Sequence, residues 1–207
     1  MTMSGMKRMW LGIVAVAAAL PVTADAHFTL MEPASWLTEN RLGDPQKAGP
    51  CGGTSADAGT PTNMVTAVTG GSKLHIKVQE TVFHPGHYRV ALAMRSRAEL
   101  PADPDVVTRD TEKGAWSVSA AIQKPERPPV IVDGLWAHTE RPTAPFETDI
   151  DVPNINCEKC TLQIIQFMAE HGRNRDGDFS YHHCADLKIT VDRSKPLDAR
   201  WPAVAGK

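Results

Sequence analysis

Apolar residues recur at every second position along most of the chain, rather than at the three- and four-residue spacing of a helix. Such alternation is typical of strands with one buried and one exposed face. Pro and Gly clusters separate the alternating segments, and the 16 prolines disfavour long helices. Strands are therefore predicted within residues 74–79, 88–94, 116–122, 146–152, 162–168 and 187–191.

Several short strands of this kind predict an all-β fold, an antiparallel β-sandwich of the immunoglobulin or fibronectin type with long loops. Residues 32–62 are rich in Gly, Pro, Ala and Thr and are expected to form one long loop. Loops longer than about 15 residues in a compact domain are usually functional or disordered. The tail after Val191, with Pro196 and Pro202, is expected to be a loose C-terminus.

The first 26 residues have the layout of a secretory signal peptide. Two basic residues precede an apolar run from Met9 to Leu20, and the small residues Ala24 and Ala26 fit the positions that signal peptidase reads. The run is too short to span a bilayer as a retained helix. Cleavage after Ala26 would leave His27 as the mature N-terminus, whereas a cut a few residues away would make His27 an ordinary histidine of the first strand.

Residues 27–207 are expected to form a single domain. Without the first 26 residues, which hold two of the 22 basic and one of the 24 acidic residues, 20 basic side chains remain against 23 acidic ones. No basic block stands out, so nucleic acid is not an expected partner. We expect a monomer that is secreted or periplasmic and leaves the membrane when the signal is removed.

Four cysteines form an even set, namely Cys51, Cys157, Cys160 and Cys184. In an exported chain, two disulfides are the default expectation for such a set. The Cys157-x-x-Cys160 spacing also occurs in redox and zinc sites, which is a weaker interpretation in an oxidising compartment.

A histidine at the mature N-terminus offers two metal ligands from one residue. The α-amine, with an ordinary pKa of about 7.7 to 8.0, and the imidazole Nδ1 close one chelate ring. A second histidine would complete a set of three nitrogens, which suits copper, whereas zinc prefers a tetrahedron. That second histidine is expected from residues 83–88, which lie between two predicted strands and contain His84 and His87.

Three short motifs resemble lytic polysaccharide monooxygenases. They are the His-Phe-Thr-Leu sequence at His27, the His-Pro-Gly turn at His84, and the Tyr-His-His-Cys-Ala-Asp sequence at Tyr181. More narrowly, they are similar to bacterial polysaccharide monooxygenase-like proteins. The resemblance implies a copper-dependent oxidoreductase that cleaves a polysaccharide such as chitin or cellulose, with electrons from an external donor.

The resemblance also implies individual roles. His27 and His84 would hold copper in a histidine brace, with His87 as the alternative ligand because only one of the two can easily point at His27. Tyr181 would lie at the axial side of the copper; its alternative role is a core tyrosine beside a disulfide. Apart from the resemblance, His171 and the adjacent pair His182-His183 could bind a metal on their own, with a histidine-rich surface loop as the alternative.

Related enzymes position oxygen with a glutamine or glutamate and a histidine. This sequence offers Gln163, Gln166, Glu170 and His171 for that role. Strand alternation places Gln163 and Gln166 on opposite faces. Gln166 and His171 are the residues that we assign to catalysis, together with Tyr181.

In the same families, a pair spaced like Cys157 and Cys160 is a local disulfide. Cys51 would then pair with Cys184 and tether the long loop to the last predicted strand.

A polysaccharide-binding surface is expected to carry exposed aromatic side chains, and Trp36, Trp116 and Trp136 are available. Trp36, close to His27 in the sequence, is the predicted substrate surface, with a core tryptophan as the alternative. A non-catalytic copper-binding or carrier protein with the same brace is the alternative to the enzyme. A zinc-binding or purely structural β-sandwich is a third, weaker interpretation.

Overall fold

A computed structural model describes residues 27–201 of the chain; the predicted signal peptide, residues 1–26, lies outside the described residues. Within residues 27–201, no helix is long and apolar enough to cross a membrane. The regular structure of this part comprises β1 His27–Glu32, β2 Val65–Thr69, β3 Lys73–Val82, β4 Gly86–Ala93, a short 3-10 turn at Arg97–Glu99, β5 Val106–Thr111, β6 Gly114–Ala120, β7 Val130–His138, β8 Phe146–Asp151, β9 Cys157–Met168 and β10 Ser180–Thr190.

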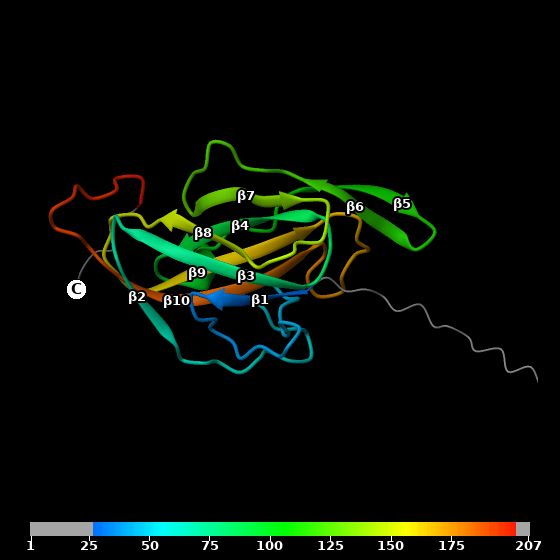
Figure 1. Ribbon diagram of the computed structural model, residues 1–207, viewed down its shortest axis with the longest axis horizontal. Helices are drawn as coiled ribbons and strands as arrows, with labels where there is room; N and C mark the ends of the chain where they lie inside the picture. Colours follow the sequence, from blue (N-terminus) through cyan, green and yellow to red (C-terminus); the bar gives the residue numbers. More distant parts are fainter. Residues whose placement is uncertain (1–26, 202–207) are drawn as a thin grey trace, which may run out of the picture.

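The strands form two facing sheets and a separate hairpin (Figure 1). One sheet has the order β1-β3-β8, the other has the order β2-β10-β9-β4-β7, and β5 pairs with β6. The prediction of an all-β sandwich is confirmed, and its immunoglobulin-type detail stays a prediction. All six segments predicted as strands overlap strands of the structure.

The core lies between the two sheets and follows from the alternation along each strand. Leu74, Ile76 and Val78 of β3 are all buried, while the residues between them are only partly buried. Alternate residues of the larger sheet, among them Val90 and Ile164, complete the same core cluster. Hydrophobic burial of one face from each sheet therefore holds the sandwich together.

Two features differ from the sequence expectations. The β2–β10 pair is parallel rather than antiparallel. A short hairpin would make neighbouring strands antiparallel, but β2 reaches the edge of the larger sheet from the long loop of residues 33–64 and is not joined to β10 by a hairpin. The tail is not loose as far as it is described. Asn154 donates three hydrogen bonds to carbonyls at residues 192, 195 and 196, and Trp201 is buried against the core.

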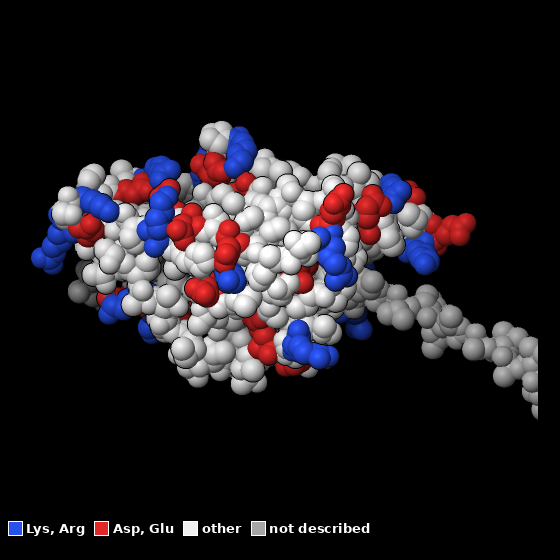
Figure 2. Space-filling view, viewed as in Figure 1, with Lys and Arg blue, Asp and Glu red and all other residues white. Residues whose placement is uncertain are grey.

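Two disulfides join the four cysteines, and the predicted pairing is confirmed. Cys51 is bonded to Cys184 across 133 residues of sequence, and Cys157 is bonded to Cys160. The first bond ties the long loop to β10, the strand that also carries Tyr181. Acidic and basic side chains are interspersed over the face shown in Figure 2, without a basic block.

Candidate metal centre

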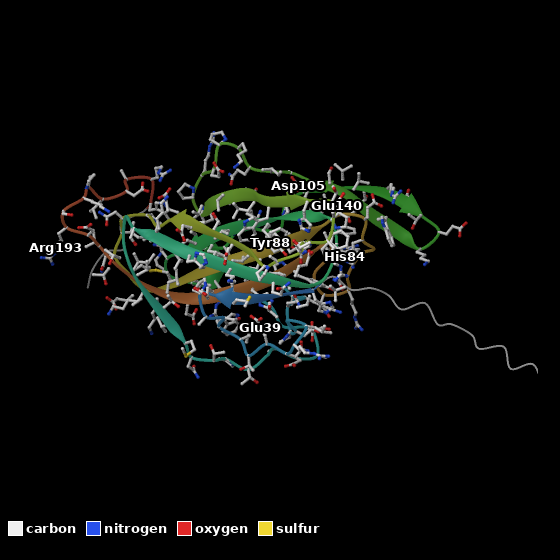
Figure 3. The ribbon with its side chains drawn as sticks, viewed as in Figure 1. Glu39, His84, Tyr88, Asp105, Glu140 and Arg193 are labelled. Carbon is white, nitrogen blue, oxygen red and sulfur yellow. A yellow bond between two sulfur atoms is a disulfide. The ribbon has the colours of Figure 1, made fainter. Side chains whose placement is uncertain are left out.

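The start of β1 lies beside the turn that joins β3 to β4. His27 pairs with Val82, the last residue of β3, and His84 follows two residues later in the turn. Figure 3 shows His84 at this end of the sandwich. Gly86, the first residue of β4, lies two positions after His84. It has no room for a side chain, since a Cβ there would lie 1.9 Å from the Phe167 carbonyl oxygen. The His-Pro-Gly motif is thus held against β9.

His27 contacts two residues that come from distant parts of the chain. Its ring meets the Tyr181 ring edge-on, with centroids 5.3 Å apart. Its Nε2 lies 3.2 Å from Oδ2 of Asp44, in the long loop. This hydrogen bond to His27 is the main cause that lowers the pKa of the Asp44 carboxyl below its usual value. A carboxylate at this position was not predicted from the sequence.

The Asp44 contact fits a chelating role for His27. In the tautomer in which Nε2 donates to Asp44, the lone pair is on Nδ1, the nitrogen that can chelate together with the α-amine. Histidines that bind metals usually donate their other ring N–H to a carboxylate in this way. Within residues 27–201, no group of three or more His, Cys, Asp or Glu side chains could hold a metal ion. A brace needs only two residues and one amine, so it is compatible with that finding.

His84 and His87 lie in different surroundings. His84 is partly buried, and its ring centroid is 4.8 Å from that of His171. His87 is buried beside Phe167, and this burial lowers the pKa of its imidazole. Because neighbours along a strand alternate, His87 faces away from the core that Tyr88 enters. The surroundings therefore favour His84 over His87 as a partner for His27.

Gln166 lies on the inner face, in one row with two tyrosines. Across neighbouring strands it pairs with Tyr88 on β4 and with Tyr181 on β10. Gln163 lies on the opposite face and donates to the Pro50 carbonyl at 2.8 Å. Only Gln166 therefore shares a side of the sheet with Tyr181.

A buried carboxylate accompanies Gln166, and sequence reasoning missed it. Glu80 is 6 % exposed and accepts hydrogen bonds from Gln166 Nε2 and, at 3.3 Å, from His138 Nε2. Its other carboxylate oxygen and the Tyr88 hydroxyl are buried without a hydrogen-bond partner in the described part of the chain. Glu80 continues the inward series of β3, so a charged residue at a core position was the available signal.

The other histidines near this end have structural partners. His171 lies in the β9–β10 loop, and its backbone N–H donates to the Ser117 hydroxyl at 3.1 Å. His182 bonds to the Asp103 carboxylate and the Lys47 carbonyl. His183 Nδ1 lies 3.1 Å from a carboxylate oxygen of Glu39 in the long loop, and its Nε2 bonds to the Phe28 carbonyl of β1. Both ring nitrogens of His182 and of His183 are thereby engaged, which disfavours these two as metal ligands.

Trp36, the predicted substrate surface, is partly buried beside the Cys51–Cys184 disulfide. Its indole N–H donates to the Cys51 carbonyl at 2.7 Å, and the guanidinium of Arg97 lies 3.6 Å from the ring centroid. One face of the ring is therefore covered by Arg97.

Comparison with models of known protein families gives no match for this chain. Comparison with curated protein sequences gives none either.

Proposed function

We propose that the protein is a secreted copper-dependent monooxygenase that cleaves a polysaccharide oxidatively, using a brace formed by His27 and His84. The observation that carries the proposal is the pairing of His27 with Val82, which brings the predicted mature N-terminus beside the His-Pro-Gly turn. The two disulfides support an oxidising compartment, as expected for export.

Each residue of the centre has a defined task in this proposal. His27 offers its amine and Nδ1, Asp44 orients the ring through Nε2, and His84 offers the third nitrogen. Copper bound there would supply the redox chemistry that activates O₂ or H₂O₂ with electrons from an external donor. Tyr181 packs against His27 and limits the access of water.

Gln166 pairs with Tyr181, which packs on His27, whereas His171 packs on His84. Gln166 is held by Glu80 in the core, and His171 lies against His84. An amide and an imidazole held in this manner could donate hydrogen bonds or hold a proton beside the proposed centre. These are the roles that we propose for them, with chitin or cellulose as the substrate class.

The test compares two chains that differ by one residue. A chain that begins at His27 is expected to bind one Cu(II) tightly, whereas a chain that keeps Ala26 has an amide in place of the amine and should bind far more weakly. Calorimetric titration measures both affinities. Equal binding by the two chains would show that the brace assignment is wrong. Oxidised oligosaccharides released from chitin or cellulose with a reductant then test the enzymatic part.

A copper carrier with the same brace is the second candidate. It is favoured by Trp36, because Arg97 covers one face of this ring and that face is not free to contact a sugar. Tight copper binding without any oxidised oligosaccharide would support the carrier over the monooxygenase.

A further inference from the structure

The β5–β6 hairpin projects at the end of the sandwich where the β3–β4 turn lies (Figure 1). An open hollow lies on this hairpin. Arg109 and Trp116 pair directly across the two strands, so their side chains share one face. The hollow, here named the Trp116 hollow, has a volume of about 440 Å³. Its lining consists of Arg109, Thr111, Glu112, Lys113, Trp116 and Glu170.

The hollow is fixed in position relative to the candidate metal centre. The backbone N–H of Ser117 donates to the His171 carbonyl at 2.9 Å, and the Glu170 N–H donates to the Ser117 carbonyl at 3.0 Å. Glu170 lines the hollow, while the next residue, His171, has its ring against His84. A ligand in the hollow would therefore lie next to the loop that contacts the proposed copper ligand.

Trp116 differs from the other two candidate tryptophans. Trp36 is covered by Arg97, and Trp136 is stacked on a phenylalanine ring. Trp116 is partly buried and has neither an aromatic nor a cation–π partner within residues 27–201. One edge of its ring lies over Gly172, where a Cβ would be 3.3 Å from Trp116 Cζ3. The ring is thus supported by backbone, and it lines the hollow.

The charges around the ring select a neutral ligand. The guanidinium of Arg109 donates to the carboxylate of Glu170. Lys113 and Glu112 also line the hollow, so the lining holds two basic and two acidic side chains. A strongly anionic ligand would be repelled by the two glutamates, and a strongly cationic ligand by Arg109 and Lys113. Hydroxyl groups, in contrast, accept from Arg109 and donate to Glu170. The ligand that fits has one apolar face for the indole and hydroxyls at its edge.

We propose that the Trp116 hollow is a subsite for a neutral pyranose unit of a polysaccharide. The C–H face of the sugar ring packs on the indole of Trp116, and its equatorial hydroxyls bond to the Arg109–Glu170 pair. The choice of a polysaccharide rests on the proposed function. The subsite itself is inferred from residues of the hairpin, and it would orient a polysaccharide that extends toward His84.

The experiment uses the copper-free chain that begins at His27, with cellohexaose and chitohexaose as probes. Binding is measured by isothermal titration calorimetry. We expect at least one probe to bind, Trp116→Ala to weaken that binding by at least tenfold, and Trp116→Phe to retain most of it. Val107→Ala is the matched control, because Val107 is an exposed apolar residue of the same hairpin outside the hollow. Circular dichroism checks that each variant is folded.

Two results would overturn the subsite. One is that neither probe binds, and the other is that a folded Trp116→Ala variant binds as tightly as the parent chain. Because copper is absent, the outcome does not depend on the brace. A chain that binds Cu(II) but no oligosaccharide leaves the copper proposal intact and removes the subsite. A chain that binds oligosaccharide through Trp116 but no Cu(II) supports the subsite and removes the copper proposal.

Discussion

Oδ2 of Asp44, in the long loop, lies 3.2 Å from Nε2 of His27, the first residue of β1. We expect Asp44→Asn to weaken Cu(II) binding about 10- to 100-fold, the usual cost of losing a group that orients a ligating histidine. Calorimetric titration of the chain beginning at His27 measures this. Asp149→Asn, which alters an exposed carboxylate on β8, is the control and should keep the parent affinity. Equal affinities for both variants would remove the orienting role of Asp44.

The identity of the second copper ligand is tested by replacing His84 and His87 with alanine, one at a time. His84→Ala is expected to abolish the two-imidazole signature in the Cu(II) paramagnetic resonance spectrum, together with copper-dependent oxidation. His87→Ala should change both much less, because His87 faces Phe167 on the other side of the sheet. Reversed effects would make His87 the ligand, and no effect from either would leave the monooxygenase proposal without its main support.

Alternation along the strands predicted which residues are buried, but it does not tell which strands pair or which residues lie opposite each other. Leu74 and Ile76 are buried as expected, and Gln163 and Gln166 lie on opposite faces. The pairing of His27 with Val82 joins strands that are far apart in the sequence, and only the complete sheet fixes it. The ligands of the centre therefore stay predictions from the sequence, whereas the neighbours of His27 are known only from the structure.

Loop residues and contacts between distant segments were the hardest to predict. Asp44 lies in a loop without periodicity, so nothing in its local sequence indicates that it reaches His27. The position of Trp116 depends on how β6 meets the β9–β10 loop, a contact between distant segments. Glu80 was different, since it follows an inward apolar series and could have been recognised as a buried carboxylate.

The two disulfides are expected to differ in their effect on stability. Replacing Cys51 and Cys184 together with alanine should lower the free energy of unfolding by about 2–5 kcal/mol, because this bond closes a long loop in the unfolded chain. Replacing Cys157 and Cys160 together should cost less, since their separation is three residues. Urea unfolding of both double variants measures the difference. An equal or larger loss for the Cys157–Cys160 pair would contradict the loop-length argument.

The last prediction concerns the buried pair of Glu80 and His138. Burial lowers the pKa of His138, but hydrogen bonds to Glu80 and to the Trp136 carbonyl outweigh it, so the pKa is raised overall. A raised pKa in the folded state means that the protonated imidazole stabilises the fold below its ordinary pKa of about 6.5. This contribution is lost as the pH rises through the folded pKa.

Glu80→Gln keeps an oxygen acceptor for His138 and Gln166 but removes the negative charge that stabilises the imidazolium. We therefore expect the variant to lose more unfolding free energy at about pH 5.5 than at about pH 8.5, because a larger fraction of His138 is protonated at the lower pH. Urea unfolding at both values measures the loss. Glu158→Gln, in an exposed ion pair with Lys188, is the control and should cost at most about 1 kcal/mol at either pH. A loss that is the same at both pH values would mean that Glu80 acts only as a hydrogen-bond acceptor in the core, because the charge of His138 would then contribute nothing to folding.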